Sequence, residues 1–192
     1  MKTSFYSVDE LKELGLSSVG EKVFISRKAS IYNPSRIKIG SNVRIDDFCI
    51  ISGNVTIGNN IHISSYSALF GGVEDDNGII LCDFATISSR ACIYAISDDF
   101  SGSTLTNSTI PDKYRKVICG NVVIEKHAVI CSGCTVLPGV VIAEGSAIGA
   151  MSLCKKSTEP WMIYAGIPAK PVKKRTQELL ACEKEFLLDN NR

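Results

Sequence analysis

The sequence predicts an all-β fold, a parallel β-helix built from short stacked coils, and three observations support this prediction. Aliphatic residues recur every six positions over most of the chain, the residues two positions before them are nearly all small or apolar, and no helical period interrupts the repeat. Six residues per strand and corner give three flat sides in a coil of about eighteen residues. A single coil cannot bury its interior, so stability comes from stacking coil on coil.

The aliphatic ladder holds fifteen positions, all Ile, Leu or Val. They are Ile39, Ile45, Ile51, Ile57, Ile63, Leu69, Leu81, Ile87, Ile93, Ile118, Ile124, Ile130, Val136, Ile142 and Ile148. A shorter ladder in a shifted phase precedes them at Val19, Ile25, Ile31 and Ile37. Strand side chains alternate between faces, so the residues two before each ladder position also point inward. We therefore expect both sets to form the core, including Cys49 and Cys134 at two of the preceding positions.

Composition excludes several classes of function. The chain has 192 residues with 21 basic and 20 acidic side chains, and this balance does not favour nucleic-acid binding. No signal peptide is recognisable, and no apolar run approaches the roughly 20 residues of a membrane span, so a cytoplasmic protein is expected. Cys131 and Cys134 form one C-x-x-C pair, without a second pair or a His at zinc-ligand spacing. We expect reduced cysteines and no metal.

The elements divide the chain into three parts. Residues 1–18 form a helical segment, in which Ser7 and Glu10 make a capping box. Residues 19–172 form the β-helix domain, broken at 94–117 by a projecting loop rich in Ser, Thr and Asp. Residues 173–192 form a basic segment and a helix, in which Leu179, Cys182 and Phe186 share one face. We expect this helix to cap the coil end or contact a neighbouring subunit rather than bind another partner.

The last coils carry three specific motifs: Val136-Leu137-Pro138-Gly139-Val140, Ile148-Gly149-Ala150 and Ala165-Gly166-Ile167-Pro168-Ala169-Lys170. With the repeat, the chain resembles the hexapeptide-repeat acyltransferases from about Val19 to Arg175, in particular the sugar acetyltransferases. The resemblance implies a left-handed parallel β-helix with a long protruding loop and short N- and C-terminal helices. It also implies acyl transfer from acetyl-CoA or another acyl-CoA to a sugar, by a homotrimer with active sites between subunits.

The resemblance further implies which residues bind coenzyme A. Main-chain groups near Gly133, Ala150 and Met151 would hold the pantetheine arm, and residues around Gly166, Pro168 and Lys170 would flank the adenine. Lys170, Lys173, Lys174 and Arg175 could meet the phosphates, since cationic donors suit a polyanionic ligand. The alternative is a solvated basic tail.

One departure from the family bears on the acceptor. Sugar O-acetyltransferases of this family usually carry a catalytic His in the loop after a coil, where this chain has Ala95-Ile96-Ser97-Asp98-Asp99-Phe100. A hydroxyl nucleophile needs a base, whereas a sugar amine is partly neutral near pH 7 and needs much less help. We therefore expect the branch that N-acylates nucleotide-linked amino sugars, as in surface polysaccharide biosynthesis.

Candidate catalytic residues are His62, which points outward from its strand, and the paired acids Asp98 and Asp99, which could orient an amine or accept its proton. His127 lies at a corner, where solvation is the usual outcome. Ser88, Ser89 and Arg90 could line the acceptor pocket, and Tyr114 in the long loop could contact the substrate. Asp98 and Asp99 could equally serve as turn residues.

Two alternative functions are also compatible with the sequence. One is sugar O-acetylation with His62 or His127 as the base. The other is a non-enzymatic scaffold or carbonic-anhydrase-like protein, although the zinc enzymes of that fold need three His ligands and this chain has two His. The closing motif and the long loop favour an enzyme.

Overall fold

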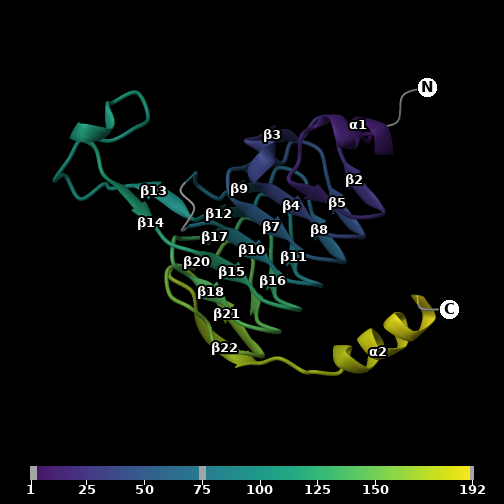
Figure 1. Ribbon diagram of the computed structural model, residues 1–192. Coiled ribbons are helices and arrows are strands. Elements are labelled where there is room, and N and C mark those ends of the chain that lie inside the picture. Colours follow the sequence, from purple (N-terminus) through teal and green to yellow (C-terminus); the bar gives the residue numbers. More distant parts are fainter. Residues whose placement is uncertain (1–3, 74–76, 191–192) are drawn as a thin grey trace.

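The computed structural model describes residues 4–73 and 77–190, so residues 1–3 and 191–192 of the two predicted terminal segments lie outside it. The chain is a parallel β-helix with three flat sides (Figure 1), as the repeat predicts, and it is left-handed, as the resemblance implies. The first side contains β1 (Ser18–Val19), β4 (Ile37–Ile39), β7 (Val55–Ile57), β10 (Ile79–Leu81), β15 (Val122–Ile124) and β18 (Val141–Ile142).

The second and third sides are built in the same way. The second contains β2 (Val23–Ile25), β5 (Val43–Ile45), β8 (Ile61–Ile63), β11 (Thr86–Ile87), β16 (Val129–Ile130), β19 (Ala147–Ile148), β21 (Met162–Ala165) and β22 (Lys170–Lys174). The third contains β3 (Ser30–Tyr32), β6 (Ile50–Ser52), β9 (Ala68–Phe70), β12 (Cys92–Tyr94), β17 (Thr135–Val136) and β20 (Leu153–Cys154). All neighbours pair in parallel except β21 and β22, which form an antiparallel hairpin.

The core runs along the axis of the helix and consists of the two predicted sets of inward residues. Fourteen of the fifteen ladder residues are buried. Full burial of an Ile side chain contributes about 1.5–3 kcal/mol, so the ladder dominates the stability. Ile118 is the exception: it is 41% exposed, and the prediction that it belongs to the ladder was wrong. It lies on an antiparallel hairpin outside the coils, at a position that matches the six-residue phase by coincidence.

The cysteines at the small core positions pack as expected. Cys49 and Cys134 are fully buried, and their thiols donate to the carbonyl oxygens of Ser64 at 3.2 Å and Gly149 at 3.1 Å. Burial raises the pKa of both thiols, so they stay protonated. In the described part of the chain, all eight cysteines are free and no group of three His, Cys, Asp or Glu residues could hold a metal ion.

Short helices occur at both ends. α1 (Val8–Glu13) has the predicted capping box between Ser7 and Glu10. Arg27 of the first coil binds the Glu10 carboxylate at 2.8 Å, which fixes α1 on the solenoid. α2 (Leu179–Asn190) returns along the outside of the second side instead of closing the coil end (Figure 1). Within the described ranges, neither helix is long and apolar enough to cross a membrane.

Candidate functional site

A hairpin carries the long loop away from the solenoid. β13 (Ile96–Asp98) pairs antiparallel with β14 (Val117–Cys119), placing Asp98 opposite Val117. At its base, the amide of the buried Ala95 donates to the Phe70 carbonyl, and the amide of Gly120 donates to Ala95. Residues 99–116, which include the short 3-10 helix η2 (Asp112–Tyr114), project beyond the coils (Figure 1).

A cavity of about 1010 Å³ lies between this hairpin, its loop and the third side. Its walls include Phe70, Tyr94, Asp98, Phe100 and Arg115. Its size is at the upper end of the range of about 300–1,000 Å³ for small-molecule sites, and its walls combine apolar surface with a few charged groups. It is therefore the best candidate for the acceptor site.

The two predicted acids have different environments. Asp98 lines the cavity with its side chain 37% exposed, and its carboxylate lies 3.7 Å from the Arg115 guanidinium. Asp99 is buried and accepts a hydrogen bond from the Ser101 amide at 2.8 Å, with Ser103 Oγ at 3.4 Å. The Ser101 hydrogen bond lowers the pKa of Asp99. Asp99 thus organises the loop, and Asp98 remains available to a ligand.

Arg115 was not among the predicted site residues, although it lies between two carboxylates on the cavity wall. Its Nε donates to Asp112 Oδ1 at 2.8 Å, and a second guanidinium nitrogen lies 3.7 Å from Asp98. Only 22% of its side chain is exposed. In the sequence, Arg115 is one of two adjacent basic residues in an otherwise polar loop. The sequence does not show which of the two faces a cavity.

Tyr114 lies elsewhere in the loop. Its ring packs beneath the Lys113 ammonium at 4.6 Å and lines a smaller pocket with residues 102–105. The structure does not bring it to the cavity that holds Asp98, and a substrate contact of Tyr114 stays a prediction.

His62 projects from β8 on the second side, as expected from its position in the repeat. Its Nε2 lies 2.8 Å from Asp46 Oδ2, and 46% of its side chain is exposed. Burial alone would raise the pKa of Asp46, but hydrogen bonds from Arg44 and His62 lower it overall. A solvent-facing imidazole held by a carboxylate could act as a base, but it is not part of the cavity wall.

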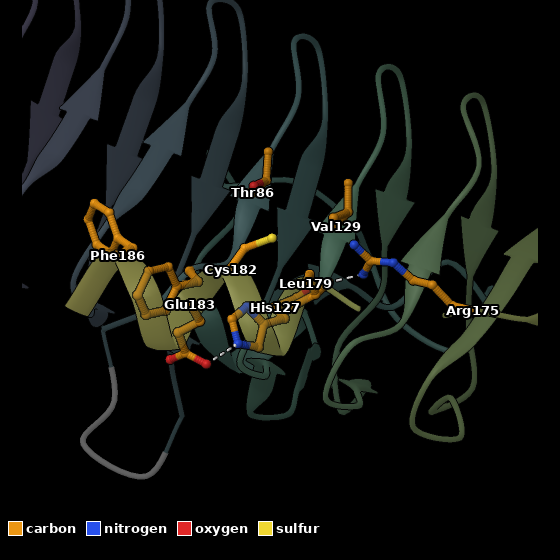
Figure 2. Close-up of a pocket in the computed structure, with 9 residues that line it drawn as sticks. Thr86, His127, Val129, Arg175, Leu179, Cys182, Glu183 and Phe186 are labelled. Carbon is orange, nitrogen blue, oxygen red and sulfur yellow. Dashed lines mark hydrogen bonds and ion pairs between the residues drawn. The ribbon is translucent and has the colours of Figure 1, made fainter. Parts of the chain in front are cut away.

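His127 differs from the expectation of a solvated corner, because α2 covers it. Only 6% of the residue is exposed, and its Nε2 lies 2.9 Å from Glu183 Oε2 (Figure 2). The Phe84 ring stacks on its imidazole with centroids 5.2 Å apart. The sequence could not show this burial, since the covering helix lies more than fifty residues further along the chain. His127 therefore ties α2 to the solenoid.

Ser88, Ser89 and Arg90 form the corner between the second and third sides. Ser89 Oγ lies 3.3 Å from Ser132 Oγ, and the Ser89 carbonyl accepts from the Gly133 amide at 3.0 Å. Arg90 is exposed at the tip of the corner in a left-handed conformation (φ 62°). This corner precedes β12, Asp98 follows it in β13, and none of the three corner residues is part of the cavity wall that Asp98 lines.

The residues expected to bind coenzyme A form two groups. Gly133 and Met151 are neighbours at the same corner, where a Cβ on Gly133 would lie 2.4 Å from the Met151 sulfur. Met151 and the adjacent Ala150 are exposed at this corner.

The second group lies in the β21–β22 hairpin and consists of Gly166, Pro168, Lys170 and Lys174. Both lysines are exposed. A main-chain hydrogen bond from Leu153 to Gly166 joins the hairpin to the last coil.

Arg175 faces the protein rather than solvent. Its Nη1 donates to the carbonyl oxygens of His127 at 2.9 Å and Gly145 at 2.8 Å, and burial lowers the pKa of its guanidinium. Figure 2 shows Arg175 and α2 around the same groove, which has a volume of about 310 Å³. Its hydrogen bonds to two main-chain carbonyls indicate a structural role, and a phosphate contact of Arg175 stays a prediction.

Comparison with known proteins shows similarity along the whole chain. The family described as bacterial transferase hexapeptide (six repeats) matches residues 36–71. The dTDP-4-amino-4,6-dideoxy-D-glucose acyltransferase of Escherichia coli is 44% identical over 177 residues, which cover 92% of each chain. A putative lipopolysaccharide biosynthesis O-acetyl transferase of Escherichia coli, WbbJ, is 34% identical over 42% of this chain and 41% of its own.

A solved structure gives a similar result. AntD, an N-acyltransferase from Bacillus cereus in complex with dTDP and 3-hydroxybutyryl-CoA, superposes with a TM-score of 0.95 at 52% identity and full coverage of both chains. The same enzyme has also been solved with dTDP-4-amino-4,6-dideoxyglucose and coenzyme A. Some of its structures carry substitutions at a serine or at an aspartate ten positions further on.

Proposed function

The chain belongs to the hexapeptide-repeat acyltransferases, and on that premise we propose that it N-acylates the amino group of a dTDP-linked 4-amino-4,6-dideoxy sugar with an acyl group from coenzyme A. The relatives that match nearly its whole length carry this activity in their names or were solved with these ligands. Enzyme activity as an acyltransferase follows from the family. The dTDP-linked acceptor is the more specific part of the proposal.

The placement of the ionisable residues is the observation that carries the choice of an amine. A carboxylate, Asp98, lines the large cavity, whereas both histidines of the chain lie outside it: His62 on the second side and His127 beneath α2. Removing a proton from a hydroxyl would require a base close to the acceptor. An amine needs a group that orients it, and Asp98 can do this by accepting a hydrogen bond from nitrogen.

In the proposed reaction, the neutral amine attacks the thioester carbonyl carbon. The new C–N bond replaces the C–S bond, and the departing thiolate takes the proton released by nitrogen, giving an amide and free coenzyme A. Asp98 positions the amine for this attack. The serine and the aspartate that were substituted in AntD are ten positions apart. In this chain, Ser88 and Asp98 have the same spacing, and so do Ser89 and Asp99. The shared spacing supports a site role for the Ser88–Arg90 corner.

The remaining parts of the site are proposed from the same geometry. The corner at Gly133 and Met151 would receive the pantetheine arm, and Lys170 and Lys174 would meet the phosphates. Asp98 lines the cavity and the Ser88–Arg90 corner does not, so a homotrimer in which neighbouring subunits share each site would bring them together. A cytoplasmic location would supply both substrates.

A second candidate is sugar O-acetylation with His62 as the base. The observation that favours it is the solvent-facing His62–Asp46 pair at 2.8 Å. The partial similarity to WbbJ agrees with it. In this reaction His62 would remove the proton from the attacking hydroxyl. An amine acceptor does not require such a base.

The experiment is a thiol-release assay with acetyl-CoA and 3-hydroxybutyryl-CoA against dTDP-linked amino sugars, amine-free dTDP sugars and free sugars. We expect turnover only with amino sugars and a product whose mass and NMR spectrum show an amide. Ester formation on amine-free sugars would contradict the proposal and favour the second candidate.

A further inference from the structure

The large cavity has an aromatic wall that the proposed reaction does not use. Phe70 and Tyr94 are the last residues of β9 and β12, and the parallel register places them side by side on successive coils. Their rings stack with centroids 5.1 Å apart and an interplanar angle of 16°. Both are only partly buried, and both line the cavity.

Other residues that line the cavity have a different character. Arg115 and Asp98 face the cavity from the hairpin and loop, 3.7 Å apart, and Val117 lies opposite Asp98 in the register. The cavity therefore combines an aromatic surface, a guanidinium and a carboxylate. A nucleotide-linked amino sugar presents a planar base, an anionic diphosphate and an amine, and each has a matching group here.

We propose that the Phe70–Tyr94 pair is the surface on which the base of the nucleotide-linked sugar packs. In this arrangement Arg115 faces the diphosphate, and Asp98 faces the amine. This inference rests on the proposed function and adds a binding site for the base to it. Aromatic side chains bind nucleobases through their π-faces and ring edges, and each such contact is worth about 1–3 kcal/mol. The pair thus contributes affinity for the nucleotide and leaves the chemical step unaffected.

A second stacked pair in the chain provides a matched control. Phe48 and Tyr66 stack with centroids 5.0 Å apart at an angle of 24° on the corner between the second and third sides. Both rings are about half exposed, and neither lines the cavity. Phe48 lies one coil farther than Tyr66 from the Ser88–Arg90 corner, so replacing Phe48 removes a comparable stack and leaves the proposed base site intact.

The test is calorimetric titration of dTDP, and separately of pyrophosphate, into the wild type, Tyr94→Leu, Phe70→Leu, Tyr94→Phe and the control Phe48→Leu. We expect the Kd for dTDP to rise about 5- to 150-fold in the two cavity Leu variants. It should change less than twofold in Tyr94→Phe and Phe48→Leu, and the Kd for pyrophosphate should not change in any variant. Unchanged dTDP affinity in folded Tyr94→Leu and Phe70→Leu would overturn the inference.

If both cavity variants fail to fold, a crystal structure of the wild type with dTDP tests the proposal. We expect the base to contact the Phe70–Tyr94 pair, and a base placed away from both rings would refute the proposal. The titration needs no turnover, so the inference and the proposed function can fail separately. Weakened dTDP binding in the Leu variants of a protein that acylates no amino sugar would refute the function alone. Full amino-sugar turnover with unchanged dTDP affinity would refute the base site alone.

Discussion

Replacement of Arg175 by Met separates two roles for the basic segment. Met keeps the apolar stem and removes the guanidinium, which donates to the carbonyl oxygens of His127 at 2.9 Å and Gly145 at 2.8 Å. A hydrogen bond from a charged donor contributes about 1.5–3 kcal/mol. Because Met cannot replace either bond and both carbonyls lose a partner, we expect the free energy of unfolding to fall by about 2–4 kcal/mol.

Thermal unfolding measures this loss. For a protein of this size, each kcal/mol corresponds to about 2–4 °C in Tm, so we expect a decrease of about 4–16 °C. The matched control is Lys174→Met, which removes the neighbouring exposed charge and should leave Tm nearly unchanged. An unchanged Tm for Arg175→Met, with a raised KM for acyl-CoA but not for its dephospho form, would show that Arg175 binds phosphate instead.

Three further predictions concern cofactor binding, the paired acids and assembly. Replacing Lys170 and Lys174 by Ala should raise the KM for acyl-CoA, more at low salt than at high salt, and equal constants for coenzyme A and dephospho-coenzyme A would contradict this. Asp98→Asn should raise the KM for the amino sugar with little change in Tm. Asp99→Asn should lower Tm near pH 7. Because the pKa of Asp99 is lowered, its carboxylate stabilises the fold above the ordinary carboxyl pKa, and this stabilisation is lost on acidification. Equal decreases in Tm for Asp98→Asn and Asp99→Asn would contradict the different roles given to the two acids. Light scattering should give a trimer at micromolar concentration, and a stable monomer would refute shared sites.

The core was predictable because one physical rule repeats along the chain. Each ladder position must be apolar and the position two before it must be small or apolar, so the period is visible without any tertiary information. The same rule failed at Ile118, whose position fits the phase although its strand pairs antiparallel outside the coils. The period shows how the residues are spaced along the chain, but it does not show which strand pairs with which.

The site was only partly predictable, because its residues meet through tertiary contacts. Asp98 and Asp99 are adjacent in sequence, and only the loop conformation separates a cavity residue from a residue that organises the loop. Phe70 and Tyr94 become neighbours only when the coil between them closes. The burial of His127 depends on Glu183 in a helix at the far end of the chain.

The central claim is acyl transfer to an amine without a histidine base, and steady-state kinetics of His62→Ala with the best dTDP-linked amino sugar test it most directly. We expect kcat to fall by much less than the roughly 10²–10⁴-fold typical of removing a general base, because an amine needs little help to lose its proton. His127→Ala should lower Tm through loss of the Glu183 contact, with a similarly small effect on kcat. A thousand-fold fall in kcat for His62→Ala at unchanged Tm would contradict the account.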